Sequence, residues 1–318
     1  MEYVKICDSQ MDDKNLLRMG YLFYDLAPNG IDKLLDDEGI KVRKRYTSKN
    51  FVHAVMAEEI AMSFAIGAKD RKDVRIRWFD ELLPELSPAI RRGLLFPRHA
   101  HTVEPRQLVQ AVAELLQQAG GRLVAERALK IVPRPDGDYR LLTNCGDRIH
   151  DRIVVAAGAW SRSLLEPLGV RLPLETERGY HAELSAPSLL PRIPLVHKDR
   201  GFAVTPMTGG LRIAGTVEIA GLDAPPDERR ADALVAQAQA LFPGLRFEHW
   251  RAWMGLRPSF PDSLPVIDRL ARHPGVVVAC GHGHFGMTAA SMTARLVSQL
   301  VRGEPAAIDL HPYRLARF

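Results

Sequence analysis

The segment with the most chemical content is CGHGHFGMTAASMT, where Gly281, Gly283 and Gly286 spell G-x-G-x-x-G between an apolar run and a helix-like run. This is how a dinucleotide-binding turn is written. The complete unit also needs a second strand after the helix and an acidic residue about twenty positions further on. No apolar strand follows position 301, and Glu304 stands before a proline in a turn. We therefore expect that these glycines do not bind a pyrophosphate.

The same loop still has the features of a ligand contact. Glycines allow the backbone to approach a ligand closely, and the N–H groups at the start of a helix attract anionic or electron-rich atoms. A tight turn without a ligand is the alternative. His282 and His284 form an H-x-H pair, but no Cys, Asp or Glu lies nearby at ligand spacing. We therefore predict a ligand contact and no bound metal.

Arg257, within the sequence GLRP, is the first candidate for substrate binding. A guanidinium at the end of a strand presents a planar fork that matches a carboxylate, and a structural salt bridge is the alternative. Tyr180 is the second candidate, for contact with the same carboxylate or with an amine, and ordinary packing is its alternative. Trp250 and Trp253 lie near Arg257 on one predicted strand, and we interpret them as core residues, with a cage around the substrate as the alternative.

Hydrophobic spacing predicts the elements that position these residues. A helix starts with Pro105 in its first turn and ends at Gly120 and Gly121. One face of this helix carries Leu108, Val112, Leu115 and Leu116. Strands are predicted at RLVAE, YRLLTN and DRIVVAAGAW, and the continuous apolar run IVVAA is typical of a strand buried on both faces.

The pattern changes between about residues 172 and 257, where short alternating segments predict a mostly antiparallel sheet inserted as a second lobe. The predicted strands are GYHAELS, GFAVTPM, GLRIAGTVE and HWRAWMGLR, and DERRADALVAQAQALF is the one helix among them. GVVVAC then reads as a buried strand, followed by the glycine motif and a final helix to about position 301.

Composition narrows the class of protein. The net charge of +5 is mild for 318 residues and does not indicate nucleic-acid binding. Three widely spaced cysteines indicate neither a disulfide framework nor a zinc site, and they fit a reducing compartment. The N-terminus lacks a secretory signal pattern, and no run is long enough to cross a bilayer. We expect a cytoplasmic protein, with the basic clusters KVRKRYTSKN and AKDRKDVRIR leaving peripheral contact with the inner face of a membrane as the alternative.

Five stretches in order, over roughly residues 93–303, resemble the FAD-dependent D-amino-acid dehydrogenase, glycine oxidase and sarcosine oxidase (DAO-type) family. They are GLLFPRHAHTVEPRQLVQAVAELLQQAGGRL, DRIVVAAGAWSRSLLEPLGVRLPLETERGYHAEL, GFAVTPMTGGLRIAGTVE, WMGLRPSFPDSLPVI and CGHGHFGMTAASMTARLVSQLVRG. The fourth resembles a W-x-G-x-R-P-x-x-P-D-x-x-P signature, and the fifth resembles the C-terminal flavin-contacting motif. The H-G-H-x-G spelling and G-Y-H favour the D-amino-acid dehydrogenases within the group.

The resemblance implies an α/β (α+β) fold, with a Rossmann-like FAD-binding lobe and an inserted antiparallel-sheet substrate lobe. The expected boundaries are residues 1–170 and 258–318 for the FAD-binding lobe and 171–257 for the substrate lobe, with residues 20–95 as an alternative part of the substrate lobe. Family members begin with a strand, G-x-G-x-x-G and a helix, and nothing of that kind stands in residues 1–90. The FAD-binding lobe is therefore expected to be incomplete at its N-terminus.

The resemblance also implies FAD as cofactor, oxidation of the C–N bond of a small amino acid, D-amino acids preferred, and an electron acceptor that is a quinone or O2. Arg257 and Tyr180 would bind the substrate. The residues expected near the cofactor are Ala157, Gly158, Ala159, Trp160, Gly281, His282, Gly283, His284, Phe285, Gly286, Met287 and Thr288. A glycine or sarcosine oxidase-type amine oxidase, one subunit of a split flavoenzyme and a non-catalytic remnant are the alternatives.

Overall fold

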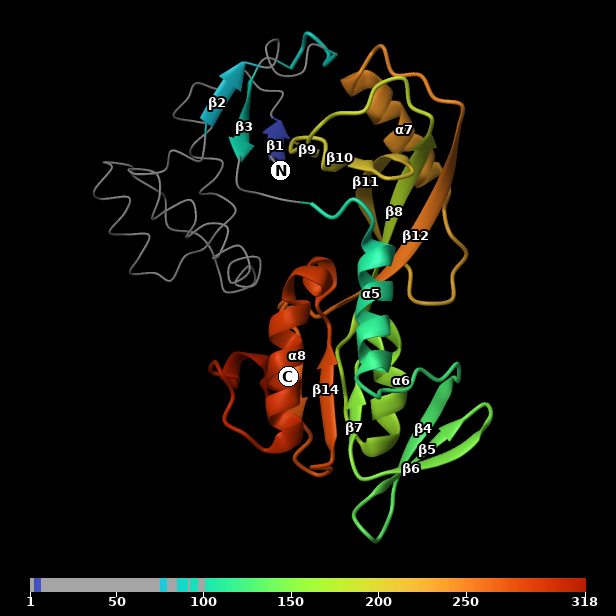
Figure 1. The fold of residues 1–318 in the computed structure, drawn as a ribbon, viewed down its shortest axis with the longest axis vertical. Coiled ribbons are helices and arrows are strands. Elements are labelled where there is room, and N and C mark those ends of the chain that lie inside the picture. The colour runs from blue at the N-terminus through green and yellow to red at the C-terminus, as the bar shows by residue number, and fades with distance from the viewer. Residues whose placement is uncertain (1–2, 7–74, 79–84, 91, 97–100) are drawn as a thin grey trace, which may run out of the picture.

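The computed structural model describes residues 3–6, 75–78, 85–90, 92–96 and 101–318 (Figure 1). Its strands are β1 Tyr3–Ile6, β2 Arg75–Trp78, β3 Arg92–Phe96, β4 Ala128–Pro133, β5 Tyr139–Thr143, β6 Gly146–His150, β7 Ile153–Val155, β8 Glu175–Ser185, β9 Leu195–His197, β10 Phe202–Met207, β11 Gly210–Ile219, β12 His249–Ser259, β13 Val266–Arg269 and β14 Val276–Cys280. Its α-helices are α5 Pro105–Gln118, α6 Ser161–Leu165, α7 Arg229–Leu241 and α8 Gly286–Arg302. Its 3-10 turns are η2 Gly158–Trp160, η3 Glu166–Leu168, η4 Gly283–Phe285, η5 His311–Tyr313 and η6 Leu315–Arg317.

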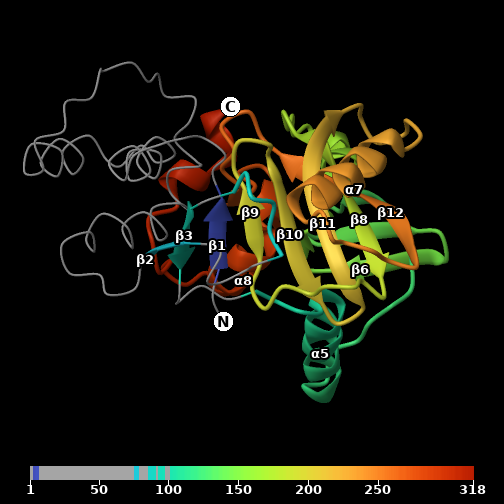
Figure 2. The ribbon, with the colours of Figure 1, turned by 90° about the horizontal axis from the view of Figure 1, so that it is seen from above.

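An eight-stranded sheet with the order β12-β8-β11-β10-β9-β1-β3-β2 forms the larger lobe. β1 and β9 are parallel neighbours, and the other neighbouring strands are antiparallel. β8 and β12 pair along their whole length, from Glu175 opposite Ser259 to Ser185 opposite His249. α7 packs on β8 and β11, and Figure 2 shows it lying across these strands.

The strands of this sheet alternate between a buried and a less buried face. In β10 the burial changes at every residue from Phe202 to Met207, which is the period-two pattern of a half-covered strand. The buried face packs against α7 in one hydrophobic core, which includes Ala182, Leu184, Ile213 and Leu234. The predicted antiparallel lobe is therefore confirmed.

A three-stranded sheet with the order β13-β14-β7 forms the centre of the smaller lobe. β14 is parallel to β7, antiparallel to β13 and buried at every position, as the apolar run GVVVAC predicts. α8 packs on β13 and β14, and α6 contacts β4 of the β4-β5-β6 meander. The buried Tyr139 ties the meander to the sheet, because its hydroxyl accepts a hydrogen bond from the Gly275 N–H at 3.2 Å. The mixed α/β fold class is confirmed.

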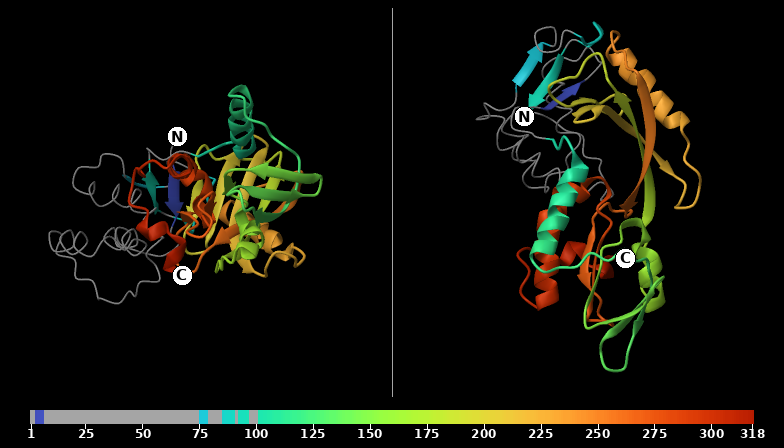
Figure 3. Two further views of the ribbon diagram at one scale, coloured as in Figure 1. Left: turned by 90° about the horizontal axis from the view of Figure 1, so that it is seen from below. Right: turned by 45° about the vertical axis from the view of Figure 1, so that its right-hand side comes forward.

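α5 starts at Pro105 as predicted, and its predicted end at Gly120 has φ +85°. Its apolar side is nevertheless exposed, and we call the residues that form it the open α5 face: Leu108, Val109, Val112, Leu115 and Leu116, each between 46% and 63% exposed. Figures 2 and 3 show α5 projecting from the rest of the ribbon. An amphipathic helix normally buries such a stripe, so this face lacks a covering partner within the described residues.

Two predictions next to α5 differ from the structure. The segment RLVAE, expected as a strand, is irregular, since no strand of the described chain pairs with it. β7 is also shorter than its apolar run, because the strand ends at Val155 and the chain enters η2 at Gly158. Within the described residues β7 has a strand neighbour, β14, on one side only. Among the described strands, this edge of the smaller sheet is therefore unpaired, and Val154 on β7 is exposed.

The predicted boundaries assign residues 1–170 to the FAD-binding lobe and leave residues 20–95 as an alternative part of the substrate lobe. β1, β2 and β3 pair with the eight-stranded sheet rather than with the smaller lobe, because β1 hydrogen-bonds to β9 and β3. The basic clusters KVRKRYTSKN and AKDRKDVRIR lie wholly or mostly outside the described residues. Among the residues that are described, no helix combines the length and the apolar character needed to cross a membrane.

Candidate active site

Two turns at one sheet edge form the centre of the candidate site. β7 and β14 are parallel neighbours, so their carboxyl ends lie side by side. β7 leads into Ala157 and η2, and β14 leads into Gly281, η4 and α8. β12 contacts both η2 and η4, and its last residue, Ser259, forms an isolated bridge with His282. The structure thus brings together the predicted segments 157–160 and 281–288 and the end of the strand that carries Arg257.

The second turn requires glycine for a geometric reason. Gly281 has φ +83°, and a Cβ at this position would lie 2.0 Å from the ring of Phe260. Gly283 follows at φ +52°, so both residues adopt a left-handed conformation that costs other residues energy. The backbone can therefore bend sharply between a buried strand and α8.

The start of α8 points its peptide dipoles into this turn. No side chain of the described residues caps the helix at Phe285, and the first N–H groups of a helix have no intrahelical partners. These groups carry a partial positive charge, which favours anionic or electron-rich ligand atoms. Met287 and Thr288 lie in this first turn, so the predicted cofactor-facing backbone is placed where it can donate hydrogen bonds.

The two histidines of the motif have different partners. His282 Nε2 lies 2.9 Å from Thr293 Oγ1, and burial lowers its pKa. His284 Nδ1 lies 3.7 Å from Glu177 Oε2 on β8. The part of the chain that is described contains no group of three or more His, Cys, Asp or Glu side chains that could hold a metal ion. Each imidazole therefore joins the turn to a neighbouring element.

Arg257 lies on the sheet face that borders η4. A Cβ at Gly179 would fall 2.0 Å from the Arg257 guanidinium carbon, so the guanidinium covers this glycine. Arg257 Nη1 is buried and has no hydrogen-bond partner among the described residues. Burial lowers the pKa of Arg257, and the carboxylate of Glu177, its register partner on β8, opposes this change. A buried donor without a partner is costly, so Arg257 is prepared to receive an anionic group.

Tyr180 does not share this position, which corrects the prediction that its phenol reaches the same carboxylate. Tyr180 and Arg178 occupy the α7 side of β8, and both are almost completely buried. The Tyr180 hydroxyl donates to Glu218 Oε2 at 2.5 Å and accepts from the Asp227 N–H at 3.0 Å. Burial, reinforced by Glu218, raises the pKa of Tyr180. The hydroxyl is therefore satisfied on the opposite side of the sheet from Arg257.

The structure adds three residues to the Arg257 side of the sheet. Glu177, His181 and Trp253 follow from the pairing of β8 with β12, which sets Arg257 opposite Glu177 and Trp253 opposite His181. Trp253 is 55% exposed and stacks on His181 with 4.7 Å between ring centroids. Trp250 packs against the core, as interpreted, but the same interpretation of Trp253 is wrong, because its side chain lies on the exposed face of β12. The odd spacing between the two tryptophans indicates opposite faces of a strand, a signal that separates their roles.

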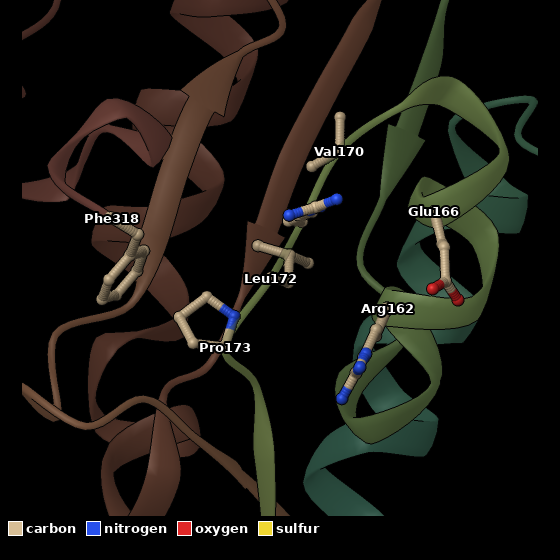
Figure 4. Close-up of a pocket in the computed structure, with 7 residues that line it drawn as sticks. Arg162, Glu166, Val170, Leu172, Pro173 and Phe318 are labelled. Atoms are coloured by element: carbon tan, nitrogen blue, oxygen red, sulfur yellow. The ribbon is translucent and has the colours of Figure 1, made fainter.

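A pocket of about 440 Å³ opens in another part of the smaller lobe (Figure 4). Its lining residues are Arg162, Glu166, Val170, Arg171, Leu172, Pro173 and Phe318. Figure 4 shows that Arg162 and Glu166 come from the α6–η3 segment, whereas Phe318 comes from the C-terminal end. None of the seven belongs to the two turns or to the Arg257 side of the sheet. This pocket is therefore separate from the candidate site.

The chain matches the model of the FAD dependent oxidoreductase (DAO) family over residues 16–300. The matched region is most of the chain, and it includes both turns, β8 and β12. The chain therefore belongs to the FAD-dependent oxidoreductase (DAO) family. FAD is the cofactor that this family uses.

Individual relatives agree with the family. The chain is 36% identical over 264 residues to a D-amino-acid oxidase of Bradyrhizobium diazoefficiens, covering 80% of this chain and 63% of the relative. It is 31% identical over 229 residues to a D-amino acid dehydrogenase of Rhizobium rhizogenes, covering 71% of this chain and 55% of the relative. The chain thus spans little more than half to just under two thirds of the length of these relatives.

A solved structure shows the same fold. Glycine oxidase from Geobacillus kaustophilus superposes with a TM-score of 0.70 at 23% identity, covering 98% of this chain and 85% of that one. At this identity the likeness concerns the fold.

The described residues fit the ring end of FAD better than its phosphate end. The glycine turn, the uncapped start of α8 and the nearby segment 157–160 offer backbone donors and a close approach for a planar, electron-rich group. After α8 come η5 and η6 rather than a strand, so the described part of the chain does not complete a second βαβ unit around the glycine motif. These residues therefore suit contact with the isoalloxazine, not with the pyrophosphate.

Proposed function

We propose that this chain provides the substrate-binding and flavin-ring-facing parts of an enzyme that oxidises the C–N bond of a small amino acid, D-amino acids preferred. The printed names of two relatives, a D-amino-acid oxidase and a D-amino acid dehydrogenase, support this substrate class. One observation carries the proposal: Arg257 Nη1, beside the cofactor-facing turn, is buried and has no hydrogen-bond partner among the described residues.

Arg257 binds the substrate carboxylate in this proposal. Its guanidinium covers Gly179 at the end of β12 that meets η2 and η4, so a bound carboxylate holds the substrate α-carbon near both turns. The planar fork fixes orientation as well as position. Glu177, opposite Arg257 and 3.7 Å from His284, balances part of the positive charge of Arg257.

The backbone turns serve the cofactor side of the reaction. FAD, when bound here, would supply the two-electron acceptor for the hydride that leaves the substrate α-carbon. The substrate loses that hydride and an amine proton, and water then hydrolyses the resulting imine to a 2-oxo acid and ammonia. The first N–H groups of α8, at Met287 and Thr288, stabilise negative charge that develops near them. Ala157, Gly158, Ala159 and Trp160 line the approach from the other turn.

Flavin reduction tests the reaction directly. The purified protein, supplied with FAD, is mixed without oxygen with D-alanine, L-alanine, glycine or sarcosine, and the absorbance of the oxidised flavin is followed. D-alanine is expected to bleach the flavin fastest. Bleaching by glycine or sarcosine alone would favour an amine oxidase of the glycine or sarcosine oxidase type. A flavin that binds and stays oxidised with all four compounds would contradict the proposal. Reoxidation by O2 or by a quinone then identifies the electron acceptor.

A role as one subunit of a split flavoenzyme is the second candidate. The open α5 face and the edge of β7 that has no strand neighbour among the described residues favour it, because a polypeptide that adds a parallel strand beside β7 would also cover apolar side chains. Co-expression with a polypeptide of the form strand, G-x-G-x-x-G, helix tests this role. Stable co-purification that raises FAD retention would support it. Monomeric, flavin-free material in the presence of that polypeptide would instead favour a non-catalytic remnant.

A further inference from the structure

β8 and β12 present a continuous row of side chains on the Arg257 side of the sheet. Across the two strands, Gly179 is the direct partner of Gly255, and the next pair on the same face, two residues further along each strand, is His181 with Trp253. Directly paired residues of an antiparallel sheet share one face. Arg257, the two glycines, His181 and Trp253 therefore all lie on the same surface.

The paired glycines bring the guanidinium and the indole together. A Cβ on Gly179 would lie 2.0 Å from the Arg257 guanidinium carbon, and a Cβ on Gly255 would lie 2.3 Å from the six-membered ring of Trp253. Cβ positions of a direct pair are roughly 4.5–5.5 Å apart. Arg257 and Trp253 thus fold over adjacent backbone positions from opposite ends of the row, so a ligand bound by one side chain lies within reach of the other.

The indole is an uncharged platform. Trp253 is 55% exposed and rests on His181 at an interplanar angle of 18°. Burial, followed by the nearby Arg212, lowers the pKa of His181 to about 4, so its ring is neutral at pH 7. Beyond this pair, Glu183 accepts hydrogen bonds from Arg212 at 2.6 Å and from Arg251 at 2.8 Å. The surface next to Arg257 is therefore aromatic, with ion-paired charges behind it.

We infer that Trp253, supported by His181, is the floor of the subsite for the substrate side chain, and that it selects amino acids with large apolar or aromatic side chains over glycine. The inference rests on the proposed function, in which Arg257 holds the carboxylate. The substrate side chain then extends from the α-carbon over the exposed indole face, where contact with the aromatic ring replaces contact with water. Glycine makes no such contact.

Turnover of a side-chain series in the FAD-loaded protein tests this assignment. The kcat/KM values for D-alanine, D-leucine and D-phenylalanine are compared in the wild type, Trp253→Ala and Trp253→Phe. Trp253→Ala is expected to lower the D-phenylalanine to D-alanine ratio about 10- to 100-fold, and Trp253→Phe to retain most of it. Trp250→Phe, on the other face of β12, is the matched control and is expected to leave the ratio unchanged. An unchanged ratio in Trp253→Ala would overturn the inference.

Binding of unreactive carboxylates separates this inference from the proposed function. Calorimetry of acetate, 4-methylpentanoate and 3-phenylpropionate is expected to show affinity that rises along the series in the wild type and stays flat in Trp253→Ala. This result would support the subsite even if no amino acid reduces the flavin, in which case the proposed reaction alone fails. Equal affinity for the three acids, or no binding of any, would overturn the subsite. Near-ultraviolet circular dichroism verifies that each variant is folded.

Discussion

Arg257 concentrates the recognition of substrate in one side chain whose surroundings leave it partly unsatisfied. Its Nη1 is buried without a partner among the described residues, while Glu177 is the carboxylate across the ladder. Arg257→Ala is expected to lower kcat/KM by roughly 30- to 1000-fold, which corresponds to about 2–4 kcal/mol of transition-state binding. Steady-state kinetics with D-alanine measures the effect. Arg257→Lys retains the charge without the fork and should recover only a small part of it, and an unchanged kcat/KM in Arg257→Ala would remove this residue from the site.

His181 links the platform beneath Trp253 to the pH dependence of stability. Its pKa falls from 6.5 to about 4 on folding, chiefly through burial and then through Arg212. The folded state therefore disfavours the proton that the unfolded state binds, so the stabilisation is complete above pH 6.5 and is lost as the pH falls toward 4. The loss attributable to His181 approaches about 3 kcal/mol. Glu183 on β8, Arg212 on β11 and Arg251 on β12 are the charged groups that surround it.

Chemical denaturation between pH 7.5 and pH 4.5 measures this contribution. The free energy of unfolding of the wild type should fall more steeply than that of His181→Phe, which keeps a ring beneath Trp253 but has no proton to bind. Parallel curves for the two proteins would show that His181 does not titrate in this range.

The turn before α8 depends on a glycine, a residue without a side chain, at position 281. Gly281→Ala is expected to destabilise the protein by about 2–4 kcal/mol, because φ +83° is unfavourable for alanine and the new methyl group would meet Phe260. Gly158→Ala is the matched control, since Gly158 also has a positive φ, +56°, but no atom of the described residues lies within 4 Å of the place that its methyl group would take. Its cost should be limited to about 1–2 kcal/mol. Thermal unfolding compares the two, and equal losses would contradict the role of Phe260.

The open α5 face is a second feature of an element rather than of a residue. Val112 and Leu115 are 59% and 63% exposed, so the double variant Val112→Glu and Leu115→Glu is expected to change stability by less than about 1 kcal/mol. Leu165→Ala, at a site that is 0% exposed, should cost about 2–5 kcal/mol. Urea denaturation measures both variants. A large loss in the double variant would show that α5 is covered in solution.

Elements were more predictable from the sequence than the contacts between them. Strands with strict alternation or a continuous apolar run, such as β10 and β14, and the helices α5, α7 and α8 follow from local spacing and from glycine or proline at their ends. The register of β8 with β12 depends on pairing between distant segments, and this register alone decides that Tyr180 and Arg257 face opposite ways. For the same reason RLVAE could not be placed, because a strand exists only with a neighbour.

At the scale of the whole molecule, the C-terminus binds to the segment that connects the two lobes between β12 and β13. Arg317 pairs with Asp262 at 2.6 Å, donates to the Leu264 carbonyl at 2.6 Å and covers the ring of Phe318 at 4.3 Å. Asp262 and Leu264 lie where the chain runs from β12 to β13. Arg317→Ala is expected to destabilise the protein by about 2 kcal/mol. Arg302→Ala, which removes an exposed pair with Glu304, should have no measurable effect. Differential scanning calorimetry compares them, and equal melting temperatures would contradict this role.

The uninterrupted pairing of β8 with β12 has a mechanical consequence. One pair of strands, β8 and β12, carries Arg257, Trp253, His181 and the two glycines. Any rotation of the sheet relative to the smaller lobe would therefore move these residues together as one rigid group. A substrate bound to this group would keep its contacts with β8 and β12 while its α-carbon moved toward or away from the turns at Gly158 and Gly281. Substrate affinity would then depend on the β8–β12 strand pair. The rate of turnover would depend on the segment between β12 and β13, which sets the position of the substrate relative to the turns.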